Sequence, residues 1–198
     1  MQIEADMGFG TLIFGSLLLF NVVYYQLTDV ICASILLYGL YKLSGVERSF
    51  RFSYFACYGF LALSLAELTV GAMELISPLA DLSTITVYLT AVRAIAVSLT
   101  LIPLLLGMRR LGLELKVRDL PERCRTAILL VCIAYGVTLI ASIPPLLSLF
   151  GQRTQLVLYM VSICGQMLAA LWALTSLYKS YATICMPKGP TASGNTKG

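Results

Sequence analysis

Three ionisable side chains interrupt long apolar stretches of the chain, namely Glu67, Glu74 and Arg93. A charged side chain inside a lipid bilayer is energetically costly, and such residues commonly bind a substrate, an ion or one another. Asp29 lies at the edge of another apolar stretch, and Gln166 lies inside the last one. These five residues are therefore the candidates for a ligand-binding site.

Glu67 and Arg93 are predicted to lie at the same depth in a membrane. They occupy consecutive apolar segments and are symmetric about residue 80. On two antiparallel helices that rise about 1.5 Å per residue, each would lie roughly 15 to 20 Å below the outer helix ends. An ion pair between them would offset much of the cost of burying each charge. Such a pair either fixes the register of the two helices or takes part in ligand binding, and the sequence leaves both interpretations open.

Three further carboxylates, Glu74, Asp29 and Asp81, are predicted near the outer helix ends. Glu74 follows Glu67 by seven residues and so lies on the same helix face, two turns nearer the outside. If the helices converge, these carboxylates form an acidic mouth that attracts a cation or an amine-bearing solute. The alternative is that they face interfacial water.

Gln166 is predicted near the middle of the last apolar segment, where its amide needs a hydrogen-bond partner. Gly165 and Ala169 are small residues four positions apart, a spacing that permits close helix approach. The pattern favours an interhelical hydrogen bond at a packing seam, with ligand binding as the second interpretation.

The composition decides the class of protein in which these residues lie. The chain has 198 residues, of which 59% are hydrophobic and 12% charged, whereas a soluble domain is about a quarter charged. This excludes a soluble enzyme, a nucleic-acid-binding module and a disordered protein. The chain has no histidine, so histidine-ligated zinc, iron or haem and a histidine-based catalytic dyad are excluded. We expect neither an enzyme nor a bound metal or cofactor.

The apolar segments set the number of membrane spans, since each span needs about 20 mostly apolar residues. Residues 7–41 contain a single charge, but as one helix they would be about 52 Å long, well beyond one span. We expect two short spans there, joined by a turn within residues 21–29. The alternative is one span preceded by a re-entrant or interfacial helix. The six predicted spans are residues 8–24, 27–43, 52–76, 85–107, 126–150 and 155–178.

The predicted fold is all-α: a polytopic integral membrane helix bundle of six transmembrane helices, or five in the alternative. Residues 1–186 would form one transmembrane domain. Residues 187–198 are rich in Pro, Gly, Ser and Thr and are predicted to be a disordered tail.

The basic residues orient this bundle. Twelve of the 14 Lys and Arg residues fall on one side of it, and cytoplasmic loops are enriched in these residues. This predicts a plasma-membrane protein with a cytoplasmic C-terminus. The basic connection over residues 108–125 is predicted to be a solvated loop or a short interfacial helix with Leu113, Val117 and Leu120 on one face.

Two functional hypotheses follow from these features. The first is a solute-binding or transport unit, whose partner is a small solute or cation bound by the intramembrane polar residues. The second is a non-transporting interaction protein, a sensor, regulator or assembly factor that binds a partner membrane protein or a second copy of itself. The first is favoured because Glu67, Arg93 and Glu74 are more charges than helix packing requires.

Overall fold

The computed structural model describes residues 2–18, 25–76, 83–143 and 151–184. Within these ranges the described side chains do not include those of residues 2–7, 17–18, 25–26, 74–75, 83–84, 86, 152 and 184. The predicted tail over residues 187–198 lies outside the described residues.

The part of the chain that the structure describes contains six α-helices and no strand, which confirms the all-α prediction. Four of them, α3, α4, α5 and α7, are long and apolar enough to cross a membrane. The other two helices, α1 with 17 residues and α2 with 19, are not among these candidate spans. Six spans are therefore not confirmed. The helices are α1 (Gln2–Leu18), α2 (Tyr25–Leu43), α3 (Arg48–Ile76), α4 (Ser83–Glu114), α5 (Leu120–Ala141) and α7 (Gln152–Ile184).

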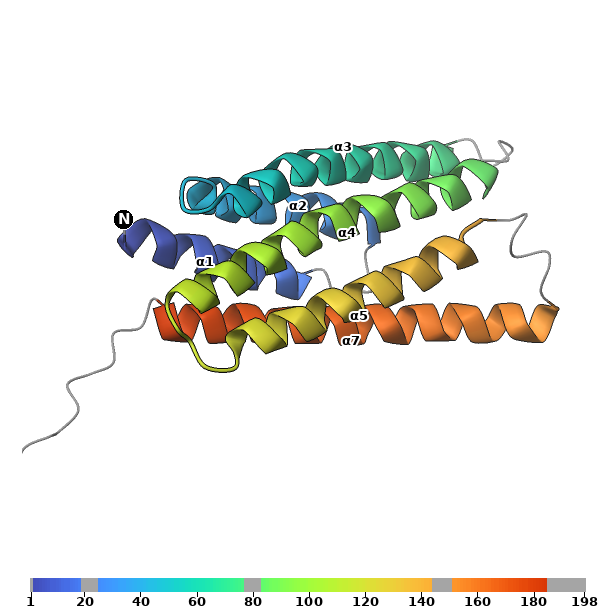
Figure 1. Cartoon of the computed structure of the whole chain (residues 1–198). Helices are drawn as coiled ribbons and strands as arrows, with labels where there is room; N and C mark the ends of the chain where they lie inside the picture. Colours follow the sequence, from blue (N-terminus) through green and yellow to red (C-terminus); the bar gives the residue numbers. More distant parts are fainter. Residues whose placement is uncertain (1, 19–24, 77–82, 144–150, 185–198) are drawn as a thin grey trace, which may run out of the picture.

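The helices form a ring in which each helix packs against the next along the chain, and α1 packs against α7. The two short helices occupy only one end of the ring, as Figure 1 shows: α1 and α2 stop partway along the bundle, whereas α3, α4 and α7 continue beyond them. The end of the ring that α1 and α2 occupy is the end where α7 finishes and where α4 is joined to α5. Because most basic residues also lie there, we call it the basic end.

Small residues let α1 and α2 pack closely. A Cβ atom at Gly39 would lie 2.9 Å from Oγ1 of Thr11 and 3.0 Å from Leu12, so any larger residue here would force these side chains to shift. Within the described residues, α1 extends to Leu18 and α2 begins at Tyr25. The turn predicted within residues 21–29 lies partly outside the described residues.

Phe50 anchors this helix pair to the rest of the bundle. Its ring meets Phe9 of α1 edge-on, with 6.4 Å between ring centroids, and lies against Gly107 of α4, where a Cβ would come within 2.8 Å of the ring. The fully buried Phe50 side chain thus joins α1, α3 and α4 at the basic end.

Glu47 ties the connection between α2 and α3 to α4. Its Oε2 accepts a hydrogen bond of 2.7 Å from the backbone N–H of Ser49, and its Oε1 lies 2.8 Å from Nη1 of Arg110. Burial raises the pKa of Glu47, but the hydrogen bonds from Ser49 and Arg110 outweigh burial and leave that pKa below its ordinary value.

The connection predicted over residues 108–125 is much shorter than expected. Helix α4 continues to Glu114 and α5 begins at Leu120, so only residues 115–119 join them, with positive φ angles at Lys116 and Asp119. Leu113 is exposed whereas Leu120 is completely buried. The long loop is therefore wrong in its extent, because most of residues 108–125 are helical, although the residues that join the two helices are largely exposed. The interfacial helix through Leu113, Val117 and Leu120 is wrong, because no helix covers residues 115–119 and Leu120 packs into the core.

The fifth predicted span, residues 126–150, is also shifted. Helix α5 ends at Ala141, close before Pro144, because the residue that precedes a proline disfavours helical geometry and proline has no N–H to donate. Residues 144–150 lie outside the described residues.

Candidate functional site

Asp29, Glu67 and Arg93 come together from three different helices. Nη2 of Arg93 on α4 lies 2.6 Å from Oδ2 of Asp29 on α2, and Nη1 lies 3.9 Å from Oε2 of Glu67 on α3. We call these three side chains the charged cluster. One guanidinium thus bridges two carboxylates, each through a different nitrogen.

The cluster lies deep in the apolar part of the bundle. Glu67 is 16 residues from Arg51 along α3, and Arg93 is 16 residues from Arg109 along α4. At about 1.5 Å per residue, both lie roughly 24 Å from the basic residues of their own helices. The predicted equal depth of Glu67 and Arg93 agrees with their contact in the structure.

The α3–α4 interface sets this register. The buried hydroxyl of Ser53 on α3 donates a hydrogen bond to the backbone carbonyl of Thr100 on α4. This bond lies between the Phe50 contact and the charged cluster, so the two helices are held together at several levels.

All three charged side chains are largely buried. The side-chain exposures are 6% for Asp29, 11% for Glu67 and 15% for Arg93. Two carboxylates and one guanidinium leave a formal charge of −1 when all three are ionised. Inside a bilayer, that excess charge needs a proton or a further cation to balance it.

Asp29 retains hydrogen-bonding capacity despite its short contact with Arg93. Among the described residues, its Oδ2 accepts no hydrogen bond of acceptable geometry, although Nη2 of Arg93 lies 2.6 Å away. The hydroxyl of Ser16 on α1 is also buried and has no hydrogen-bond partner among the described residues. A buried acceptor of this kind can receive a further donor.

The cluster differs from the predicted arrangement at Asp29. The sequence placed Asp29 at the outer edge, above the Glu67–Arg93 pair, whereas the structure makes it the closer partner of Arg93. The reason is that α2, although about as long as the predicted span, begins partway along the bundle rather than at its outer end (Figure 1). Glu74 lies on α3 as predicted, but its side chain and Asp81 are outside the described residues, so the acidic mouth stays a prediction.

Gln166 belongs to a second polar group, well separated along the chain. Its Nε2 donates hydrogen bonds to Oγ1 of Thr138 at 2.7 Å and to Oγ of Ser162 at 3.4 Å, and these two hydroxyls lie 2.7 Å apart. Thr138 is on α5 while Ser162 and Gln166 are on α7. We call them the neutral cluster. The interhelical hydrogen bond favoured by the sequence is therefore present, but Thr138 and Ser162 were not anticipated.

The neutral cluster lies on a seam of small residues. A Cβ at Gly165 would lie 3.4 Å from Cβ of Ala134, and Ala169 is buried. The hydroxyl of Thr138 also bonds the backbone carbonyl of Ala134 one turn earlier. Helices α5 and α7 therefore approach closely enough for their hydroxyl and amide groups to bond one another.

Neither cluster provides a metal-binding set, because no three His, Cys, Asp or Glu side chains gather within the described residues. Cys32, Cys57 and Cys124 are buried in the core as free thiols. No family model, curated protein or solved structure matches the chain. The apolar helices fit a membrane-embedded protein, and the charged cluster is the chemical feature that the fold places inside it.

Proposed function

We propose that the chain is a multi-pass membrane protein that binds a small cationic or amine-bearing solute at the charged cluster and serves as a solute-binding or transport unit. The observation that carries this proposal is the excess of one carboxylate over the single Arg93 guanidinium. A pair that only fixed helix register would need one charge of each sign.

The geometry of the cluster favours an amine among cations. A primary ammonium donates up to three hydrogen bonds, and Oδ2 of Asp29 is a buried acceptor without a well-aligned donor. The carboxylate of Glu67 lies 3.9 Å from Arg93, longer than a hydrogen bond, so its contact with the guanidinium is purely electrostatic. Both carboxylates can therefore accept hydrogen bonds from a bound ammonium.

In this proposal the protein crosses the plasma membrane six times, and α1 and α2 are two short spans. The basic end faces the cytoplasm, together with the C-terminus, because Lys and Arg are retained on that side. Helix α2 has 19 residues and is about 28 Å long, close to the roughly 30 Å of the hydrocarbon core. In the alternative, α2 is one span and α1 is a re-entrant or interfacial helix that precedes it, which gives five spans. The proposal includes no catalytic step and no cofactor.

Equilibrium binding of radiolabelled methylammonium to the purified protein tests this proposal. Wild type is expected to bind it, and Glu67→Gln is expected to lose at least tenfold in affinity, because a carboxylate that accepts from an ammonium contributes about 1.5–3 kcal/mol. Glu47→Gln is the matched control, since it makes the same chemical change at the basic end. Binding that is absent in wild type, or equal in wild type and Glu67→Gln, would reject the proposal.

Uptake of methylammonium into proteoliposomes then separates transport from binding alone. A transport unit is expected to accumulate the probe in response to an imposed ion gradient, and Glu67→Gln to abolish this accumulation. Binding without uptake would assign the chain to solute binding only.

A second candidate function is that of an interaction protein, and the shortness of α1 and α2 favours it. Helices α3 and α7 continue past the ends of these two helices, and both carry exposed apolar side chains such as Met73 and Met160. A partner membrane protein or a second copy of the chain would cover such surfaces. Co-purification of a stoichiometric partner that protects Met73 and Met160 from oxidation would support this function.

A further inference from the structure

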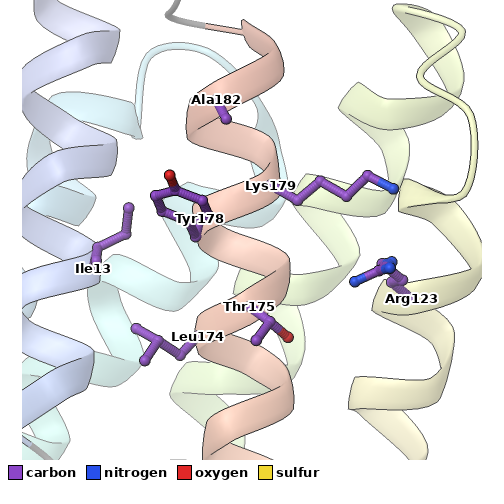
Figure 2. Close-up of a pocket in the computed structure, with 7 residues that line it drawn as sticks. All are labelled: Ile13, Arg123, Leu174, Thr175, Tyr178, Lys179 and Ala182. Atoms are coloured by element: carbon purple, nitrogen blue, oxygen red, sulfur yellow. The ribbon is translucent and has the colours of Figure 1, made fainter.

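We propose that a groove on α7 at the basic end binds the phosphate of an anionic phospholipid, with its acyl chains along the apolar part of the groove. This site is distinct from the charged cluster and does not depend on the proposed solute. The groove has a volume of about 610 Å³. Its lining residues come from α1, α5 and α7, and α7 runs between the other two helices (Figure 2).

The groove faces away from the bundle core. Its floor includes Thr175 and Tyr178, which are exposed. Ser176, Leu177 and Ser180 are buried and lie on the opposite face of α7. A ligand in this groove therefore contacts whatever surrounds the bundle. For a membrane-embedded helix, that surrounding is lipid.

The two sides of the groove differ in chemistry. Ile13 of α1, Leu174 and Tyr178 form an apolar side, while Arg123 of α5 and Lys179 lie on the other, with Lys179 directed toward α5 (Figure 2). An apolar wall next to two cations matches a phospholipid, in which the acyl chains join a negatively charged headgroup. A free phosphate ion would use only the cationic side.

Lys179 is available for such a headgroup. Its Nζ lies 3.7 Å from Oδ2 of Asp119, whose side chain is 65% exposed. An ion pair of this length at an exposed site contributes little to stability. Lys179 can therefore leave Asp119 and pair with a lipid phosphate at little cost in free energy. Tyr178 is half-exposed beside Lys179, and tyrosine is enriched where headgroups meet acyl chains.

Fluorescence of Trp172, the single tryptophan of the chain, gives a direct test. Trp172 lies on α7 three residues before Thr175 and seven residues before Lys179, so it shares a helix face with these two groove residues, and its side chain is exposed. Lipids with brominated acyl chains in the groove are therefore positioned to quench it. The protein would be reconstituted in mixtures of brominated phosphatidylglycerol or brominated phosphatidylcholine with unbrominated lipid. Wild type is expected to prefer the anionic lipid by about five- to thirtyfold, because each nearby Lys or Arg contributes roughly fivefold.

Matched variants locate the effect. In the double variant Arg123→Gln/Lys179→Gln, the ratio of the affinity for anionic lipid to the affinity for phosphatidylcholine is expected to fall close to one. The control Lys116→Gln/Arg118→Gln removes the same charge from the exposed α4–α5 connection and is expected to retain most of the preference. Equal losses in the two double variants, or no preference in wild type, would overturn the proposal. Relief of quenching by millimolar inorganic phosphate would instead identify a free anion as the ligand and reject the lipid.

Discussion

The charged cluster and the neutral cluster both place polar side chains inside an apolar helix bundle, but they pair these side chains in different ways. In the neutral cluster, Thr138, Ser162 and Gln166 bond one another, and Thr138 also bonds a backbone carbonyl. In the charged cluster, Arg93 faces two carboxylates.

The difference between them separates packing from chemistry. A group of hydroxyls and an amide that bond one another holds two helices together and needs nothing else. A group with an excess carboxylate is costly in a bilayer unless it binds a proton or a cation. The charged cluster is therefore the region where a ligand is expected, and substitutions in the two regions should have different consequences.

The largest effect is expected for Arg93→Met. This change leaves Asp29 and Glu67 buried without their shared guanidinium, and breaking a buried ion pair by removing one partner costs about 3–5 kcal/mol. Chemical unfolding in detergent, followed by circular dichroism, measures the loss. The triple variant with Asp29→Asn and Glu67→Gln in addition is expected to recover most of the stability. A stable single variant would mean that Arg93 does not neutralise the two carboxylates.

Substitutions of the two carboxylates are expected to lower the free energy of unfolding by different amounts. Asp29→Asn removes the 2.6 Å contact and should lower the free energy of unfolding by about 1–3 kcal/mol. Glu67→Gln removes only the 3.9 Å contact and leaves the closer Asp29–Arg93 pair intact, so its effect should stay within about 1 kcal/mol. The same unfolding measurement compares them. The reverse order would show that Glu67, not Asp29, is the main partner of Arg93.

Substitutions in the neutral cluster should cost less. Gln166→Leu and Thr138→Val each remove an interhelical hydrogen bond, and such bonds in membrane proteins average about 0.6 kcal/mol. Unfolding of each variant and of the double variant measures the two effects and their coupling. A loss as large as that of Arg93→Met would remove the distinction between the clusters.

The smallest effect concerns Glu47 and Arg110 at the basic end, and it depends on pH. The pKa of Glu47 is lowered from about 4.5 in the folded protein. Its carboxylate therefore stabilises the fold above pH 4.5, and this contribution is lost as the pH falls through the lowered pKa. At neutral pH, the free energy of unfolding of wild type should exceed that of Glu47→Gln by no more than about 0.5 kcal/mol, because the Arg110 side chain is exposed. The difference should disappear in acid, as melting curves across pH would record.

The sequence predicts the long helices and one contact of the charged cluster well. Hydropathy indicates α3, α4 and α7, and the equal spacing of Glu67 and Arg93 about residue 80 indicates their contact. The end of α5 is less predictable, because apolar residues continue past Ala141 and the prolines after it act through backbone geometry rather than hydropathy.

Asp29 was misplaced because its depth depends on where α2 begins. Lys42 marks the basic end of α2, and a count of about 1.5 Å per residue from Lys42 puts Asp29 roughly 20 Å deep, near the level of Glu67. The distance along the helix from Lys42 could therefore have predicted the depth of Asp29 from the sequence. The partners of Gln166 had no such signal, because Thr138 and Ser162 resemble the many hydroxyls that bond only their own helix.

The proposed ligand at the charged cluster is tested most directly by the shift in melting temperature that methylammonium causes in purified protein. A rise is predicted for wild type, for Glu47→Gln and for Gln166→Leu, because all three retain both carboxylates of the cluster. No rise is predicted for Glu67→Gln, in which Asp29 and Arg93 balance each other. An equal rise in Glu67→Gln, or none in wild type, would contradict a cation site at Asp29, Glu67 and Arg93.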